Sequence, residues 1–401
     1  MSRILKSIGI RGYKILSQTK KGDCLEVDLQ APKKRPPVCT RCSSTRIQSK
    51  GTYERRVRHL ECFGHSSRLR IRCRRFRCLD CKSSFLQQLP GILPGKHSSQ
   101  PFRENVYTLH HEGISSSATG RLKKLGPATV SRIYGEFTQR KASERLSLNC
   151  PLMLGIDEHT LHKNRQFATT FCDLGNHRIF DIVEGKSAAE LEGFLSHLIG
   201  REKVKVVCID LCSAYRSLVR RYFPNAILVA DRFHVVRIVL HHFIQLAREL
   251  APAAFVRRGI AGLLRKAPEN LSAPEKERLE TIFKNHPVLR LVHTEMHEFR
   301  GLLNKKHQTV ARAKKLIPRL LSYIKKYKTE KFAPMQTLAK TLHSWRGEIA
   351  AMWRFTKNNG ITEGFHRKMK LIQRRAYGFR NFQNYRLRVI GLLIKDWGHR
   401  G

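Results

Sequence analysis

The sequence is poor in acidic residues and contains no long apolar run. It has 31 Asp and Glu against 77 Lys and Arg, so its 401 residues carry a formal net charge of +46. Self-repulsion of this size favours a polyanionic partner. No stretch reaches the roughly 18 apolar residues of a membrane-spanning helix, and the first residues lack the pattern of a signal peptide. We therefore expect a cytoplasmic protein without membrane association.

Eleven cysteines in a cytosolic chain of this length indicate metal binding more than disulfides. Two CxxC pairs are separated by 35 residues, and paired knuckles of this kind supply four thiolates to one structural Zn²⁺. Cys62, Cys73 or His59 could replace one ligand. The predicted zinc ligands are Cys39, Cys42, Cys78 and Cys81.

The segment between the two knuckles alternates like the strands of a ribbon, in YERRVRHL and SRLRIRCRRFRC. Between Lys33 and Arg77 it holds 15 Lys and Arg but only Glu54 and Glu61 as acidic residues. A dense positive face of this kind suits contacts to DNA phosphates. We therefore predict a zinc-binding ribbon domain over residues 1–88, with DNA contacts from Arg74, Arg75 and Arg77.

A linker rich in Pro and Gly, at 89–101, precedes a pattern typical of three helices. Ser115 or Ser116 should cap the second helix, the chain should break at Leu125-Gly126, and Pro127 should lie in the first turn of the third. We predict a helix-turn-helix DNA-binding domain over 98–145, although similar helix pairs occur in proteins that bind nothing. Its predicted DNA contacts are Thr129, Ser131 and Arg132.

From residue 150 the pattern changes to strands. Segments 152–157, 165–174 and 177–185 should form an antiparallel meander, followed by a helix opened by a Ser187–Glu190 capping box. A strand ending at Asp210, a helix and a strand ending at Asp231 complete the series. This order of elements is that of a ribonuclease H-like mixed sheet, in which the first and fourth strands lie side by side and parallel.

In such a sheet Asp157 and Asp210 project from corresponding ends of neighbouring strands. Two carboxylates held together repel one another unless a divalent cation lies between them. Oxygen ligands suit Mg²⁺, with Mn²⁺ as a substitute, and two such ions can activate a water or a 3′-hydroxyl and stabilise the leaving oxygen. Asp231 also ends a strand and is the alternative second aspartate.

Residues 238–349 show the apolar spacing of helices. We interpret them as an α-helical insertion into a catalytic domain formed by 150–237 and 350–401; an independent bundle is the alternative. Glu363 lies in the first turn of a later helix and precedes ten Lys and Arg but one acidic residue. Trp345 and Trp353 could stack on bases or be buried in the core. Predicted phosphate contacts beyond Glu363 are Lys368, Arg374, Arg375 and Arg380.

Several sequence blocks together resemble the ISL-three family of bacterial insertion-sequence transposases, which carry an amino-terminal zinc finger. They are CxxC…RRFRCxxC, GIDE, IDLCSAY, FPNA…DRFHVV and NNGITEGFHRKMKLIQRRAYGFRNFQNYRLRV. The resemblance implies a ribonuclease H-like transposase whose Asp-Asp-Glu triad falls on Asp157, Asp210 and Glu363. Asp231 and His234 look like the acidic-x-x-His pair that Mutator-like transposases place before a helical insertion.

The resulting hypothesis is an α+β multidomain enzyme with a zinc ribbon, a helix-turn-helix and an interrupted ribonuclease H-like sheet. It would bind double-stranded DNA at the terminal inverted repeats of its element and join the cut ends to target DNA, as a homodimer associated with the nucleoid. Its cofactors would be two Mg²⁺ ions and one structural Zn²⁺. The alternatives are a catalytically inactive DNA-binding regulator derived from a transposase and a nuclease without sequence preference.

Overall fold

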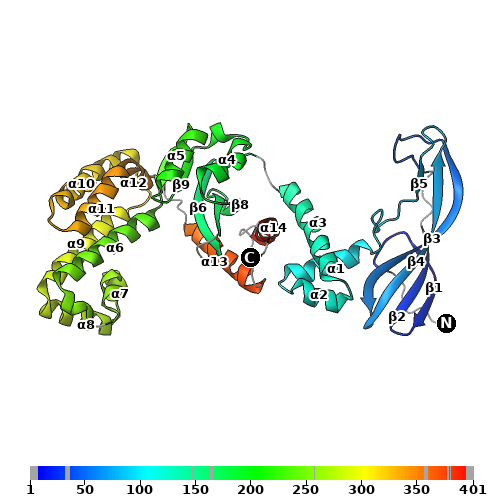
Figure 1. The fold of residues 1–401 in the computed structure, drawn as a ribbon, viewed down its shortest axis with the longest axis horizontal. Coiled ribbons are helices and arrows are strands. Elements are labelled where there is room, and N and C mark those ends of the chain that lie inside the picture. The colour runs from blue at the N-terminus through cyan, green and yellow to red at the C-terminus, as the bar shows by residue number, and fades with distance from the viewer. Residues whose placement is uncertain are drawn as a thin grey trace. The chain divides into compact units, whose positions relative to one another are not determined.

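The computed structural model describes residues 8–31, 37–145, 149–162, 166–256, 258–355, 360–376, 379 and 381–393; side chains 142, 144, 145, 162, 360–363 and 393 lie outside the description. The chain forms two compact units, Met1–Arg140 and Lys141–Gly401 (Figure 1). Among the described residues, no helix is long and apolar enough to cross a membrane.

A five-stranded sheet forms the first part of the first unit, with the order β1-β2-β4-β3 and β5 paired to β4. The predicted ribbon is the long antiparallel hairpin of β3 and β4, turned by Phe63 and Gly64, which both have positive φ. Such a two-residue turn matches the twist of paired strands. The strands are β1 (Lys14–Lys21), β2 (Cys24–Gln30), β3 (Ile47–Cys62), β4 (His65–Cys78) and β5 (Ser84–Leu86).

Along β4, alternate residues point to opposite faces of the sheet. Leu69, Ile71 and Cys73 are fully buried in the core of the sheet, while Arg72 and Arg74 between and after them are exposed. The alternation in SRLRIRCRRFRC therefore produces one apolar face and one cationic face.

Three helices complete the first unit: α1 (Gln100–His111), α2 (Ser116–Lys123) and α3 (Pro127–Arg145). Ser115 caps α2 by accepting a hydrogen bond of 3.1 Å from Ala118 N, and Pro127 is the first residue of α3, as the sequence predicts. The buried His59 ties the ribbon to these helices, with 2.7 Å from Nδ1 to Ser99 Oγ, the cap of α1.

The second unit is built on a five-stranded sheet of order β10-β9-β6-β7-β8. β6, β7 and β8 are antiparallel neighbours and form the predicted meander, whereas β9 runs parallel to both β6 and β10. The first strand does not end at Asp157 as predicted, because its pairing with β7 continues to His162. The strands are β6 (Met153–His162), β7 (Gln166–Asp173), β8 (Arg178–Glu184), β9 (Val206–Ile209) and β10 (Ile227–Ala230).

Helices cover both faces of this sheet. Ile156, Phe171 and Ile209 belong to the core cluster shared with α4 (Ala188–Ser196) and α5 (Ser213–Tyr222). Ala168, Cys172 and Cys208 point the other way and pack against α13 (Gly360–Arg375) and α14 (Phe382–Leu393). The sheet is the middle layer of three, and α13 reaches it from the far end of the sequence.

Between β10 and α13 the chain forms helices that extend the core of the sheet. One continuous cluster of buried residues runs from the sheet into these helices, and α12 packs on β10. The α-helices of this segment are α6 (Arg232–Leu250), α7 (Ile260–Arg265), α8 (Ala273–Asn285), α9 (Pro287–Leu303), α10 (Val310–Thr329), α11 (Ala333–Ser344) and α12 (Arg346–Met352).

Both tryptophans near the end of this segment are buried. Trp345 is 6% exposed and Trp353 is fully enclosed, with its Nε1 donating to Leu302 O at 3.1 Å. Side chains enclosed in this way pack the core and do not offer a face for stacking on bases.

The replacement Trp353→Ala should therefore destabilise the second unit by about 3–5 kcal/mol, because it leaves a large cavity and removes the hydrogen bond from the indole to the Leu302 carbonyl. Calorimetric unfolding of the variant would measure the loss. The exposed Leu291→Ala, on α9, serves as the control and should leave the transition unchanged. An unfolding temperature of Trp353→Ala equal to that of the wild type would contradict the core assignment.

Candidate catalytic and zinc-binding sites

Strand register aligns three aspartates at one end of the sheet. Ile156 pairs with Ile209, and Ile209 pairs with Ala230 on its other side, so the next residues are Asp157, Asp210 and Asp231. Neighbouring strands lie about 4.8 Å apart, which keeps consecutive carboxylates of such a row within reach of a shared cation. The structure thus brings Asp157 and Asp210 to equivalent positions on parallel strands.

His234, in the first turn of α6, lies against this row. Its Nδ1 contacts the Asp210 carboxylate and is 3.5 Å from Asp231 Oδ2. Suitable ligand atoms of Asp210, Asp231 and His234 lie within 4.8 Å of one another, a grouping that could hold a metal ion.

The side chains of Asp210 and Asp231 differ in their surroundings. Asp231 caps α6 by accepting from Phe233 N at 3.3 Å, and its side chain is 3% exposed. The Asp210 side chain is 21% exposed. Asp210 is therefore the more accessible of the two to a hydrated ion or a phosphate, while one Asp231 oxygen is already engaged with the helix.

The electrostatics of the row follow from burial and from like charge. Burial, and then the charge of Asp210, raise the pKa of Asp157 from its ordinary 3.8 to about 7. Burial alone would lower the pKa of His234, but the hydrogen bond and charge of Asp210, with the charge of Asp231, outweigh it and raise that pKa. A divalent cation would relieve the repulsion that Asp157 experiences.

The helix that contains Glu363 packs on the same side of β6 as Asp157. Glu363 lies in the first turn of α13, and its side chain is outside the described residues. One turn later, His366 Nδ1 is 3.6 Å from Asp157 Oδ2. Residues three apart share a helix face, so this turn of α13 is the one that adjoins the row of aspartates.

A buried hydrogen-bond network holds α13 and α14 on the sheet. His366 Nε2 is 3.2 Å from Thr170 Oγ1, which is 3.1 Å from His159 Nδ1, and His159 Nε2 is 2.9 Å from Tyr385 OH. Burial, with the charge of His366, lowers the pKa of His159 to about 3, so its imidazole is neutral. The sequence patterns assigned no role to these four residues. The spacing of Glu363 and His366, which are one helical turn apart, could have indicated that His366 lies beside the proposed site.

The predicted DNA contacts lie mostly on open surface. Arg74, Arg75 and Arg77 are exposed on β4, Ser131 and Arg132 are exposed on α3, and Thr129 is half-buried beside Arg132. On α13, Lys368 is half-buried while Arg374 and Arg375 are exposed; Arg380 lies outside the described residues.

In the first unit, the four predicted cysteines form one cluster. Cys39 Sγ is 3.5 Å from Cys81 Sγ, Cys42 Sγ is 3.6 Å from Cys78 Sγ, and all four sulfurs lie within 4.8 Å of one another. The Ser83 hydroxyl, 3.5 Å away, lowers the pKa of the Cys39 thiol to about 6. Four thiols at this spacing fit the tetrahedral coordination of a structural zinc ion.

The alternative zinc ligands lie elsewhere. Cys62 pairs with His65 at the opposite end of the ribbon, roughly 40 Å from Cys78 at the rise of a strand. Cys73 is fully buried in the core of the sheet, and both ring nitrogens of His59 bond to Ser99 and Ile8.

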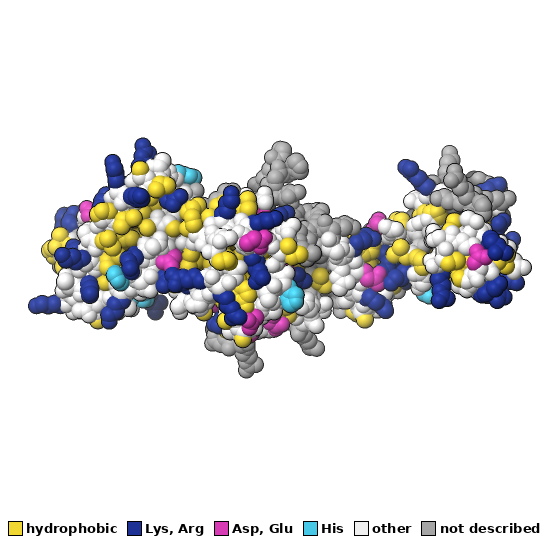
Figure 2. Space-filling model, turned by 90° about the horizontal axis from the view of Figure 1, so that it is seen from above, with side chains coloured by type: hydrophobic (Ala, Val, Ile, Leu, Met, Phe, Trp, Pro, Cys, Tyr) yellow, Lys and Arg dark blue, Asp and Glu magenta, His cyan; other side chains and the backbone are white. Residues whose placement is uncertain are grey.

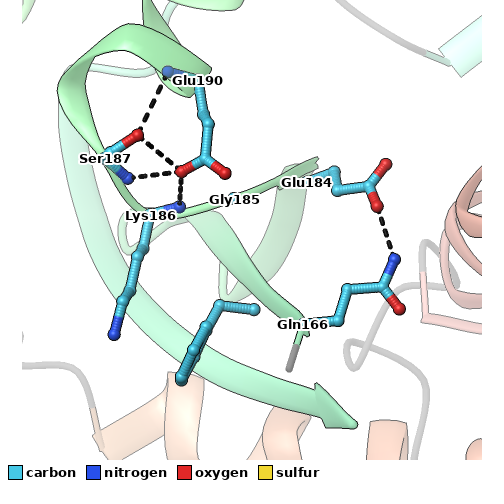
Figure 3. A pocket seen from close by; sticks show the side chains of 7 residues that line it. Gln166, Glu184, Gly185, Lys186, Ser187 and Glu190 are labelled. Atoms are coloured by element: carbon cyan, nitrogen blue, oxygen red, sulfur yellow. Dashed lines mark hydrogen bonds between the residues drawn. The ribbon is translucent and has the colours of Figure 1, made fainter. Parts of the chain in front are cut away.

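A hollow of about 690 Å³ lies beside β7, β8 and α4, and none of the three aspartates of the row lines it (Figure 3). Its polar groups already bond to one another: Gln166 donates to Glu184, and the Glu190 carboxylate accepts from Ser187 and from Lys186 N. The Lys186 ammonium lies 3.6 Å from the centre of the Phe167 ring.

The carboxylate row on the mixed sheet and the cysteine cluster earlier in the sequence are both arrangements that could hold metal ions, as in a metal-dependent enzyme. Residues 154–389 match a family model described as transposase, and residues 35–81 match the zinc-finger of transposase IS204/IS1001/IS1096/IS1165. The first match covers more than half of the chain, so the chain belongs to the ISL3 family of DDE transposases, as its motifs indicate. It is therefore a DNA-acting enzyme.

A relative is the transposase for insertion sequence element IS1001 of Bordetella parapertussis. It is 26% identical over 377 residues, which are 89% of each chain.

Zinc analysis should separate the ligand cysteines from the others. Cys42→Ser should lower the zinc content from about one ion per chain to well below that value, since a hydroxyl replaces a thiolate in the cluster. Elemental mass spectrometry of the purified proteins gives the ratio. Cys62→Ser is the matched control and should retain the metal; equal zinc loss in both variants would show that the cluster is misassigned.

The raised pKa of Asp157 should make stability depend on pH. Because the folded protein holds this proton more tightly than the unfolded chain, the contribution is present below pH 4 and is lost as the pH rises through 7. In buffer with zinc in place but without other divalent cations, Asp157→Asn should match the wild type near pH 4. It should exceed the wild type by a few kcal/mol at pH 8.

Thermal unfolding of both proteins across this pH range would measure the difference. Added Mg²⁺ should stabilise the wild type more than the variant. A difference that stays constant from pH 4 to 8 would argue against the buried, like-charged environment of Asp157.

Proposed function

We propose that this transposase binds the terminal inverted repeats of its own insertion sequence and catalyses Mg²⁺-dependent cleavage and transfer of DNA strands. The observation that supports it best is the register that aligns Asp157 with Asp210 on adjacent parallel strands. Burial and the charge of Asp210 raise the pKa of Asp157 to about 7. Such a pair is suited to ionise around a bound cation.

Asp157, Asp210 and Glu363 are the residues that would hold two Mg²⁺ ions, or Mn²⁺ in their place. Bound there, the ions would activate the attacking water or 3′-hydroxyl and stabilise the leaving oxygen. The strand order, with β6 between β9 and β7, supports a ribonuclease H-like catalytic domain of residues 150–237 and 350–401, interrupted by the helices of 238–349.

His234 would orient Asp210 through the contact to its carboxylate, so that the free oxygen faces the metal. Asp231 would fix the start of α6 as its cap. The network from His366 to Tyr385 would hold α13 in register with β6, and with it the turn that contains Glu363.

DNA recognition would come from the zinc-binding ribbon of residues 1–88 and a helix-turn-helix of residues 98–145. The exposed arginines of β4 would contact phosphates, and Thr129, Ser131 and Arg132 on α3 would face the major groove. Lys368, Arg374, Arg375 and Arg380 would contact DNA along α13. Both ends of an element must be held at once, so we propose a homodimer in the DNA complex.

The replacement Asp210→Ala tests the catalytic assignment. Cleavage of labelled element ends in Mg²⁺ should fall at least about 10³-fold, roughly 4 kcal/mol of transition-state stabilisation, while affinity for the same DNA stays within about twofold. Gel analysis of products and a binding titration give the two values. Glu249→Ala, an exposed carboxylate on α6, is the control and should cleave normally.

Full cleavage by Asp210→Ala would sink the assignment. If the wild type binds the repeats but does not cleave them, the protein would instead be an inactive regulator. Membership of the transposase family argues against that alternative. Equal cleavage of repeat and scrambled DNA at physiological salt would indicate a nuclease without sequence preference.

A further inference from the structure

One stretch of the helical segment is rich in cations and contains no acidic residue of its own. Residues 299–329 hold ten Lys and Arg and no Asp or Glu, whereas α8 carries three Lys or Arg and three Glu. A surface that serves solubility alone mixes both signs, as α8 does. Six exposed cations of this stretch form what we call the α10 ridge: Lys305, Lys306, Arg312, Lys314, Lys315 and Arg319.

The ridge surrounds the N-terminus of α10, where the helix dipole favours negative charge. The first turn of α10, like those of α6 and α9, has no acidic residue, whereas α4 and α8 place Glu190 and Glu275 there. Among the described residues, no ion pair is recorded for the ridge, and Lys326 farther along α10 pairs with Glu295 at 2.7 Å. Exposed cations gathered at this helix end favour binding of a negatively charged partner.

The ridge begins beside the row of aspartates. The buried Arg232, which follows Asp231 directly, donates to Leu303 O at 3.2 Å and to Lys305 O at 3.1 Å. From the other side, Gln308 N donates to Trp353 O at 3.0 Å. These hydrogen bonds hold the backbone of the loop between α9 and α10 close to the end of the sheet that carries the aspartates. The lysine side chains of the loop remain exposed.

We propose that the α10 ridge binds the phosphate backbone of the DNA duplex held at Asp157 and Asp210, without reading its sequence. This inference rests on the proposed function, because the same duplex is the substrate of the catalytic site. Duplex DNA presents one charge per about 1.7 Å of its axis, so the first half of α10, about 15 Å long, spans several phosphates. Figure 2 shows how frequent Lys and Arg are on the visible surface and how sparse Asp and Glu are.

Salt-dependent binding tests the ridge. Lys305→Gln/Lys306→Gln is compared with Lys276→Gln/Lys284→Gln, two exposed lysines of α8 in the same helical segment. Affinities for an element-end duplex and a scrambled duplex are measured by fluorescence anisotropy at several NaCl concentrations without Mg²⁺. In the ridge pair, the negative slope of log K against log salt should become shallower by roughly 1.8 on both duplexes, because two phosphate contacts are lost. The α8 pair should keep the wild-type slope.

Equal slopes in the ridge pair and the α8 pair would overturn the proposal, and a loss confined to the element-end duplex would overturn its sequence-blind character. Unchanged thermal unfolding of the ridge pair excludes misfolding as the cause of a lower slope. If the wild type fails to cleave element ends while the ridge pair still lowers the slope, the proposed catalytic function fails and the ridge stands. If the wild type cleaves and the slopes coincide, the ridge alone is wrong.

Discussion

The parallel register of β6, β9 and β10 is the constraint on which the second unit depends. Asp210 and Asp231 directly follow β9 and β10, whereas Asp157 lies within β6, and pairing Ile156 with Ile209 and Ile209 with Ala230 forces the three carboxylates into one row. Burial and the neighbouring charge of Asp210 both disfavour the ionised form of Asp157, and its raised pKa expresses that cost. The chain offsets part of it with His234, which contacts Asp210, and with the backbone amides at the start of α6.

Local sequence predicted the elements around this row because their signals lie within a few residues of one another. The capping box at Ser187, the cap at Ser115, Pro127 opening α3, and the alternating ribbon all appear as predicted. The paired CxxC knuckles predicted the cysteine cluster because the two ligands of each knuckle lie within four consecutive residues. Strand ends pointed to Asp157 and Asp210, although pattern alone could not separate Asp210 from Asp231.

The remaining part of the site depends on contacts between distant segments. His159 and Tyr385 are 226 positions apart, and no spacing rule links them. The roles of Asp210 and Asp231 diverge only through exposure, because Asp231 is enclosed as a helix cap while Asp210 remains open. Buried polar networks of this kind specify one arrangement, since each unsatisfied member would be costly. Here the network fixes how α13, which lies near the end of the sequence, packs against β6, which begins at Met153.

Arg232 shows why the helical segment is more than a spacer between β10 and α13. Its guanidinium donates to the carbonyls of Leu303, Lys305 and Met352, so one buried side chain gathers the end of α9, the loop before α10 and the end of α12. Because Arg232 follows Asp231, these three points are fixed to the carboxylate row itself. A displacement of α6 would therefore move the row of aspartates and the start of the α10 ridge together, which would couple the proposed DNA contact to the geometry of the proposed catalytic carboxylates.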